Sequence, residues 1–223
     1  QHQVRVGVIS RGYGGTGPFP ALVLPDSPAN VVGDEPCLIV QNTHVPMAVG
    51  SNRQQAIELL LKHHQLDLII SDDGLQHWAL ARQLEWIVLD NNRGLGNQKL
   101  LPEGFLREPV SRLQNSTVIE HSAQPTSKMH MHLQVGEPYL LNANSDDLPA
   151  FDLKQKFHVV VGIGYPKRFY DSLNSIGVTN IQAHEFADHY AYELSDLQFE
   201  DAAPIITTEK DAVKIKRSEE HTS

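Results

Sequence analysis

Two adjacent carboxylates at the end of a short apolar run are the residues here whose types and spacing most suggest chemistry. The apolar residues 68–70 are followed, after one serine, by Asp72, Asp73 and Gly74. Buried parallel strands are typically short apolar runs, and open α/β sheets bind ligands at the carboxyl ends of their strands. Mg²⁺ is usually held by one or two carboxylates together with substrate phosphates. The run therefore fits a Walker B strand of phosphoryl transfer, with a solvated turn as the plainer alternative.

Asp34 and Arg53 are candidates at the starts of two predicted helices. Residues 33–36, Gly-Asp-Glu-Pro, open the first helix, where Asp34 could serve only as the N-cap. The functional alternative for Asp34 is a general base that accepts the proton of an attacking hydroxyl. Arg53 opens the second helix, where a cation is unfavourable against the helix dipole, and this misfit favours a role as a phosphate ligand.

Polar residues that follow the two acids, or that end a long loop, extend the set of candidates. Gln76 and His77 lie within one turn of the acids. Arg107 and Glu108 close the Gly-, Pro- and Asn-rich stretch 91–108, and loops of that length are usually functional or disordered. A surface ion pair is the plain interpretation of Arg107 and Glu108. An arginine for phosphate and a glutamate near a metal is the functional one.

Several short motifs have two interpretations each. Residues 11–18, RGYGGTGP, look like a phosphate loop, but no G-x-x-x-x-G-K-[ST] occurs in the chain, so a strand-to-loop turn is favoured and only Arg11 keeps a functional interpretation. Residues 162–164, Gly-Ile-Gly, lack the third glycine of a dinucleotide-binding turn. Residues 186–190, FADHY, suit the edge of a site. Residues 207–211, TTEKD, fit a helix cap better than a lysine directed toward phosphate.

Composition limits the class of protein. The chain has 223 residues, of which 40% are hydrophobic, and a formal net charge of −9. This acidic balance argues against general nucleic-acid binding, although a few arginines could hold a small phosphorylated substrate. Cys37 is the single cysteine, so no internal disulfide can form, and we expect it in the core. No stretch approaches the roughly 20 apolar residues of a membrane span.

Strands and helices are predicted to alternate along the chain. Strands are expected at 4–9, 46–49, 66–70, 84–89, 118–120, 129–135, 138–141, 157–161, 180–183 and 205–206. Helices are expected at 37–42, 53–64 and 167–176. The alternation predicts an α/β fold with a parallel, doubly wound sheet, and the polar stretch 145–152 is expected to link it to a second α/β unit.

Taken in order, the motifs resemble the tetraacyldisaccharide 4'-kinases, the lipid A 4'-kinase family, over residues 6–214. The blocks that carry the resemblance are SRGYG, GDEP, Arg53, SDDGLQH, RGLGNQKLLPEGFLREP, GIGYPKRF, FADHY and TTEKDAVK. The DDGxQH and LREP blocks are specific in this combination.

The resemblance implies an ATP-dependent kinase that transfers the γ-phosphate to the 4'-hydroxyl of a tetraacyl glucosamine disaccharide 1-phosphate, forming lipid IVA in lipid A biosynthesis. The implied cofactors are ATP and Mg²⁺. The implied partners are the lipid A disaccharide precursor and the membrane surface, with no nucleic acid and no protein partner. The implied location is the cytoplasmic face of the bacterial inner membrane, with peripheral or N-terminal attachment.

The resemblance also assigns roles to residues. Asp34 matches the catalytic base, and His189 matches its partner in an Asp–His pair. Asp72 and Asp73 match the Walker B acids, and Glu108 joins them near the metal. The positions placed around nucleotide or substrate are Arg53, Gln76, His77 and Arg107.

The implied fold is a P-loop NTPase-like parallel sheet domain, with its N-terminal part missing, joined by β segments to a smaller C-terminal α/β domain. The corresponding ranges are 1–127 for the kinase domain, 128–154 for the β linker and 155–216 for the smaller domain. Residues 217–223 are expected to be an artefactual tail.

A Walker A loop is expected before Val4, so the chain is expected to be a fragment that binds ATP poorly and turns over little or not at all. Two other functions stay open. One is a metal-dependent hydrolase that uses Asp72, Asp73 and His77. The other is a non-catalytic nucleotide- or sugar-binding module.

Overall fold

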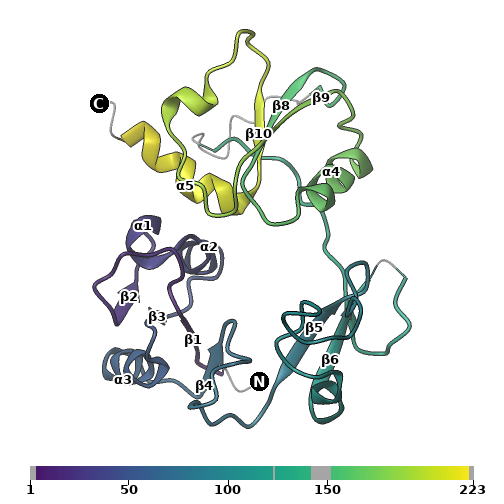
Figure 1. The fold of residues 1–223 in the computed structure, drawn as a ribbon. Helices are drawn as coiled ribbons and strands as arrows, with labels where there is room; N and C mark the ends of the chain where they lie inside the picture. Colours follow the sequence, from purple (N-terminus) through teal and green to yellow (C-terminus); the bar gives the residue numbers. More distant parts are fainter. Residues whose placement is uncertain (1–3, 123, 142–151, 221–223) are drawn as a thin grey trace. The chain divides into compact units, whose positions relative to one another are not determined.

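The computed structural model describes residues 4–122, 124–141 and 152–220, with side chains described as far as residue 215. The chain forms two compact units (Figure 1). The first unit comprises Gln1–Asp73 with Val135–Ser223, and the second comprises Gly74–Gln134. Most of the expected linker at 145–152 lies outside the described residues. The predicted division at 127 and 155 stays a prediction for the whole protein.

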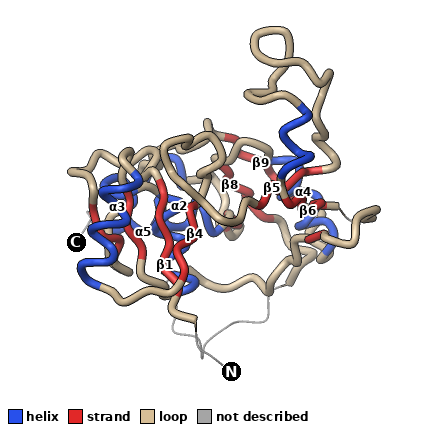
Figure 2. Tube along the Cα trace, turned by 90° about the horizontal axis from the view of Figure 1, so that it is seen from below, coloured by secondary structure: helices blue, strands red, loops and turns tan. Residues whose placement is uncertain are grey.

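A four-stranded sheet in the order β2-β3-β1-β4 forms one part of the first unit. The parallel strands β3, β1 and β4 are adjacent, and Figure 2 shows β1 beside β4, while β2 pairs antiparallel with β3 at the edge. The strands are β1 (Val6–Ser10), β2 (Ala21–Val23), β3 (Met47–Val49) and β4 (Leu68–Ser71). Because the three parallel strands share a direction, their carboxyl ends lie at one edge of the sheet.

Three helices accompany this sheet: α1 (Ala29–Val32), α2 (Asp34–Thr43) and α3 (Arg53–His63). Helix α3 begins where the side chain of Asn52 accepts a hydrogen bond from the Gln55 amide at 3.2 Å, and it buries Ala56 and Leu60, four residues apart on one face. Cys37 on α2 belongs to the apolar core of this part, and burial raises the pKa of its thiol to about 11. The expectation that Cys37 is a core residue is therefore confirmed.

A three-stranded parallel sheet in the order β10-β8-β9 forms the other part of the first unit. Its elements are β8 (Phe157–Val161), α4 (Pro166–Ser175), β9 (Ile181–Glu185), a 3-10 turn η2 (Leu194–Leu197), β10 (Ile205–Thr207) and α5 (Glu209–Glu220). Every residue of β8 is buried, as its mostly apolar run predicts for the central strand of a parallel sheet. Helix α5 contacts α2, which joins this part to the four-stranded sheet.

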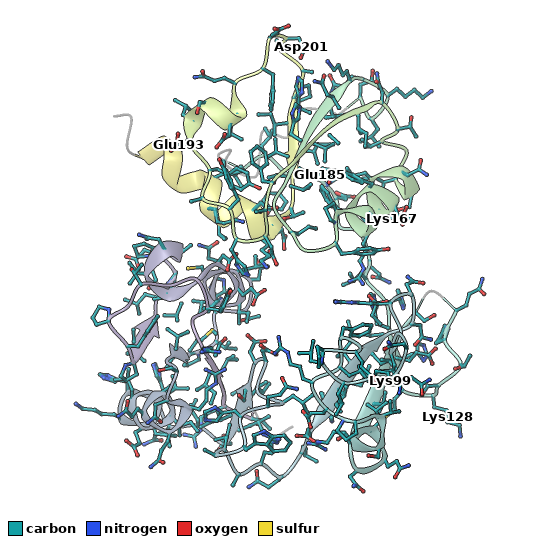
Figure 3. The ribbon with its side chains drawn as sticks, in the orientation of Figure 1. Lys99, Lys128, Lys167, Glu185, Glu193 and Asp201 are labelled. Atoms are coloured by element: carbon teal, nitrogen blue, oxygen red, sulfur yellow. The ribbon has the colours of Figure 1, made fainter. Side chains whose placement is uncertain are left out.

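The buried histidine of β8 is satisfied by its neighbours. His158 lies 2.9 Å from a ring nitrogen of His184 and 2.8 Å from Asp201. Phe199 stacks on both imidazoles, and Lys156 also binds Asp201, which Figure 3 labels in the loop before β10. This cluster gives a buried polar group its hydrogen bonds.

The second unit contains a parallel three-stranded sheet in the order β5-β6-β7. Its elements are β5 (Trp86–Asp90), a 3-10 segment η1 (Val110–Asn115), β6 (Thr117–His121) and β7 (His130–Met131). Residues 91–109 contain turns and a single isolated β-bridge between Leu100 and Leu106, which confirms the predicted long loop.

The α/β class with parallel sheets is confirmed, and most predicted elements are present within a few residues of their expected bounds. The strand predicted at 138–141 is wrong, and the strand predicted at 129–135 is reduced to β7. Pro138 has no amide hydrogen to donate, and the stretch 132–140 is exposed. The elements β2 and α1 escaped the prediction because three or four residues are too few to show a period. Helix α5 also runs through Glu220, into the expected tail; residues 221–223 lie outside the described part.

We predict that Leu60→Ala lowers the free energy of unfolding by about 2–5 kcal/mol, because Leu60 is fully buried and its truncation leaves a cavity. The adjacent Leu61 is 48% exposed on the same helix, so Leu61→Ala is the matched control, with an expected change within about 0.5 kcal/mol. Urea unfolding of the two variants measures the difference. Equal losses would contradict the assigned face of α3.

Candidate functional site

The carboxyl edge of the four-stranded sheet positions the first group of candidate residues. Ile9 pairs with Ser71 across β1 and β4, and the Asp72 amide extends this ladder by donating to the Ile9 carbonyl at 2.9 Å. Asp72 is thereby held beside Ser10, whose hydroxyl donates to its carboxylate at 3.0 Å. The strand predicted to present the acids does so, and the sheet fixes the backbone of Asp72.

Asp72 is a carboxylate removed from water at this edge. Burial raises its pKa, the hydrogen bond from Ser10 and the charge of Arg53 oppose that rise, and the negative charges of Glu35 and Asp73 add to it. Asp73 is exposed and has a left-handed backbone with φ 43°. An incompletely compensated carboxylate of this kind is suited to bind a cation.

Arg53 is buried at the same edge, with 3% of its surface exposed. Its guanidinium donates from Nη1 to the Gly50 carbonyl at 2.8 Å, while its buried Nε has no hydrogen-bond partner in the described part of the chain. Burial lowers the pKa of Arg53, as does the charge of Arg11, and the charges of Asp72 and Asp73 act in the opposite direction. A buried cation with an unused donor fits the predicted role as an anion ligand.

Asp34 and His189 form a direct contact across the first unit. The Nδ1 atom of His189 lies 3.0 Å from Oδ2 and 3.2 Å from Oδ1 of Asp34. An ionised carboxylate can only accept hydrogen bonds, so it requires the proton on Nδ1. Asp34 is 5% exposed, whereas the His189 side chain keeps 26% of its surface exposed. The pair that the resemblance implied is therefore brought together by the fold.

The capping alternative for Asp34 is wrong in position. Gly33 is the N-cap of α2, with φ 102°, and Asp34 is the first helical residue. A side chain at Gly33 would meet the Tyr13 carbonyl at 2.8 Å, so the positive φ and the close backbone both require glycine. The Asp34 carboxylate does accept the Glu35 amide at 3.0 Å, which uses one of the free donors of the helix start.

The glycine-rich turn at 11–18 is held against α1 rather than left open. The amides of Thr16 and Gly17 donate to the carbonyls of Asn30 and Val31, and a Cβ at Gly15 would lie 2.5 Å from the Val31 carbonyl. The interpretation as a strand-to-loop turn agrees with this packing. The turn also presents Tyr13, whose ring centroid lies 5.0 Å from that of His189.

Lys210 and Tyr13 lie near the pair, where sequence reasoning did not place them. Lys210 contacts the carboxylates of Glu35 and Asp188, and Tyr13 contacts the imidazole. Nothing in the spacing of these residues predicts that they meet. The capping interpretation of the TTEKD motif is confirmed, because the Asp211 amide donates to the Thr208 hydroxyl at 3.1 Å.

Four predicted residues lie in the second unit. Gln76 donates to Glu108 at 2.9 Å, and Arg112 binds the other oxygen of Glu108 at 3.1 Å. Arg107 is exposed. The Glu108 carboxylate is thus shared between an amide and a guanidinium, which were not predicted as its partners.

Arg82 shapes the backbone that follows the two acids. Its guanidinium donates to the carbonyls of Gly74 and His77 at 3.2 Å and to that of Leu75 at 3.0 Å, and it pairs with Glu85 at 2.7 Å. The rigid fork of donors on arginine suits this multiple capture. Arg82 is therefore the residue that fixes the turn carrying Gln76 and His77.

Two alternatives lose support in the described residues. No group of three or more His, Cys, Asp or Glu side chains able to hold a metal occurs there, so side-chain clustering gives the metal-dependent hydrolase no support. The turn at Gly162, the candidate dinucleotide-binding turn, is occupied by contacts within the chain. The Gly162 amide donates to Asp211 at 3.0 Å, and a Cβ at Gly162 would lie 2.7 Å from the Tyr192 hydroxyl.

None of the described helices is long and apolar enough to cross a bilayer.

Comparison with a solved structure identifies the fold class of the chain. The chain aligns with a solved structure described as the "apo" form of LpxK from Aquifex aeolicus in complex with ATP, with a TM-score of 0.69 and 26% sequence identity over 95% of this chain and 70% of that chain. This similarity confirms the expected fold class, an α/β protein of the P-loop NTPase-like kind.

The family model of the tetraacyldisaccharide-1-P 4'-kinases matches residues 1–223. A protein named tetraacyldisaccharide 4'-kinase from Psychrobacter cryohalolentis is 49% identical over 97% of this chain and 64% of its own length. A protein of the same name from Actinobacillus pleuropneumoniae serotype 5b is 47% identical over 97% of this chain and 68% of its own length. The chain belongs to the tetraacyldisaccharide-1-P 4'-kinase family, and it spans about two thirds of the length of these relatives.

We predict that Asp72→Asn raises the free energy of unfolding at pH 7, and that this gain shrinks as the pH falls toward 4. The folded-state pKa of Asp72 lies above the usual value, so the folded protein binds this proton more readily than the unfolded chain does. The ionised carboxylate therefore costs stability above the folded-state pKa, and protonation at acid pH removes that cost. Urea unfolding at both pH values measures the effect.

The matched control is Asp73→Asn, because Asp73 is exposed and Asn tolerates its left-handed backbone. Its change is expected to stay within about 0.5 kcal/mol at both pH values. A loss of stability in Asp72→Asn at pH 7 would show that the carboxylate is fully compensated in the folded protein.

Proposed function

We propose that this protein is an ATP-dependent kinase that phosphorylates the 4'-hydroxyl of a tetraacyl glucosamine disaccharide 1-phosphate, an intermediate of lipid A biosynthesis. Family membership, the names of the relatives and the ATP complex of the solved LpxK support the proposal. The observation that carries it is the contact between Asp34 and His189, because a sugar hydroxyl needs a proton acceptor as it attacks phosphorus.

The reaction forms an O4'–phosphorus bond and breaks the bond between the γ-phosphorus and the oxygen that leaves with ADP. The hydroxyl proton passes to the Asp34–His189 pair, for which Asp34 is the proposed base. Asp34 holds this proton, and the hydrogen bond from Nδ1 holds the carboxylate and the imidazole as one unit, with 26% of the His189 side chain exposed. Positioning and charge neutralisation supply most of the remaining catalysis in phosphoryl transfer.

The carboxylates fit the expected magnesium ion. Asp72 is a half-buried carboxylate whose pKa is raised by burial, and Asp73 follows it at the sheet edge where ligands of α/β folds bind. In the proposal these two residues hold Mg²⁺, which neutralises phosphate charge when bound. Glu108 is proposed as an additional metal residue.

Four side chains are proposed to bind nucleotide or substrate: Arg53, Gln76, His77 and Arg107. Arg53 has the strongest support because its buried Nε lacks a partner in the described part. A bound phosphate would neutralise the Arg53 guanidinium and so offset the free-energy cost of burying it. The proposed site of action is the cytoplasmic face of the bacterial inner membrane, where the acylated substrate would be reached from the membrane surface.

We predict that Asp34→Asn lowers kcat by roughly 10²–10⁴, the range expected for the loss of a general base. His189→Gln should lower kcat as well, and the double variant should be little worse than the more damaged single variant, because the two side chains act as one unit. Steady-state kinetics of the full-length protein measures these values. Losses that multiply in the double variant would contradict a shared role, and an unchanged rate in Asp34→Asn would remove Asp34 as the base.

A second prediction concerns the metal. Asp72→Asn and Asp73→Asn should raise the Mg²⁺ concentration that gives half-maximal rate, because each removes one carboxylate ligand. Asp26→Asn is the matched control, since Asp26 is an exposed aspartate to which the proposal gives no role. A Mg²⁺ titration of the full-length protein compares the variants. Titration curves that coincide with that of Asp26→Asn would exclude the two acids from the metal site.

A further inference from the structure

A single lysine joins the two segments that carry the Asp34–His189 pair. The Nζ atom of Lys210 lies 3.0 Å from Oε1 of Glu35 and 3.3 Å from Oδ1 of Asp188. Glu35 directly follows Asp34 in α2, and Asp188 directly precedes His189 in the loop after β9. One ammonium group therefore contacts the chain neighbours of both members of the pair.

Lys210 is the more shielded partner in both ion pairs. Its side chain is 20% exposed, against 50% for Glu35 and 42% for Asp188. Burial lowers the pKa of Lys210, but the hydrogen bond to Glu35 and the charges of Glu35, Asp34 and Asp188 outweigh it, so the net shift is upward. The ammonium is thus held charged by a set of carboxylates that includes the proposed base.

The backbone that carries Lys210 is itself anchored. Asp211, the next residue, is fully buried, and its Oδ2 accepts hydrogen bonds from the Gly162 amide at 3.0 Å and the Thr208 hydroxyl at 2.8 Å. Gly162 follows β8, the central strand of its sheet. These bonds fix the start of α5 to the sheet, so the lysine extends from a rigid base toward α2.

His189 adopts a backbone conformation that needs support. Its φ of 61° lies in the left-handed region, which is unfavourable for a non-glycine residue and persists only where the surroundings impose it. The Oδ1 atom of Asp188 accepts the His189 amide at 3.1 Å and is the same atom that Lys210 contacts. Lys210 therefore braces the carboxylate that stabilises this turn and directs the imidazole toward Asp34.

We propose that Lys210 is a positioning residue for phosphoryl transfer, which aligns Asp34 with His189 by binding Glu35 and Asp188 at the same time. The expected effect of Lys210 on catalysis rests on the proposed function. Its expected effect on the alignment of the pair rests on the two ion pairs. Among the described residues, Glu35, Asp188 and Tyr13 also lie against the pair or its chain neighbours, and the charge of Asp34 acts on Cys37 while that of Glu35 acts on Asp72.

The first test is kinetic, in the full-length protein. Lys210→Met should lower kcat roughly 10- to 100-fold with little change in KM for ATP, because a small displacement of a reacting group costs that much while nucleotide contacts remain. Lys210→Arg should restore most of the rate, since arginine keeps the charge and can reach both carboxylates. A larger effect on KM than on kcat, or no rescue by arginine, would overturn the proposal.

The control is Lys167→Met. Lys167 also forms an ion pair with a carboxylate, Asp171 at 2.8 Å, but on the exposed face of α4, where Figure 3 labels it. Its removal should leave kcat unchanged. A loss in Lys167→Met equal to that in Lys210→Met would show a general effect of removing lysines.

The second test does not depend on turnover. In the 223-residue chain, a proton on Nδ1 of His189 that is hydrogen bonded to Asp34 should give a downfield NMR signal, assigned by its loss in His189→Gln. Lys210→Met should remove or broaden that signal, whereas Lys210→Arg and Lys167→Met should retain it. A sharp signal in Lys210→Met would overturn the proposal.

The two tests separate the possible failures. If Asp34→Asn keeps full activity while the NMR signal depends on Lys210, the assignment of the base fails and the positioning contact stands. If Lys210→Met does not fold, Glu35→Gln, Asp188→Asn and their double variant provide the same NMR readout, and retention of the signal in the double variant would overturn the proposal.

Discussion

Asp34 and His189 are 155 residues apart in the chain, yet a hydrogen bond of 3.0 Å joins their side chains. This contact requires that the start of α2, beside the four-stranded sheet, and the loop after β9, in the three-stranded sheet, lie against each other. The contact of α2 with α5 and the ion pairs of Lys210 hold the same two parts together. The candidate site exists only while this junction is closed.

The site concentrates charge in places where a protein core would ordinarily exclude it. Arg53, Asp34 and Asp211 are buried, and the pKa of Asp72 is raised by burial. Buried charges cost stability unless they are paired, and Arg53 and Asp72 remain incompletely compensated in the chain alone. Such residues are common where a protein gives up stability for function, and in the proposed function the ligand supplies the missing partner.

The second unit uses charge differently. Arg82 gathers the carbonyls of the turn that follows the acids, and Arg112 links Glu108 to Glu85. These arginines bind backbone carbonyls and carboxylates of the chain itself. Gln76 and Glu108, both predicted from the motifs, meet because that framework is in place.

The sequence by itself determined the local features. The apolar run at 68–70 predicted a strand that ends in two acids, the apolar periodicity of residues 53–64 predicted the helix α3, and the TTEKD motif predicted a helix cap. These outcomes depend on neighbours within a few residues, which is the range over which periodicity, capping and turn chemistry act. The ordered motifs also identified the family.

Only the tertiary structure decided which distant side chains meet. Tyr13, Lys210 and Arg82 have no pattern that marks them, since their roles arise from contacts with segments far along the chain or from backbone carbonyls that carry no sequence signal. The capping alternative for Asp34 failed for the same reason, because the close approach of the Tyr13 carbonyl requires a glycine at the cap. Long-range packing sets these contacts, and no local pattern in the sequence marks which distant residues will pack together.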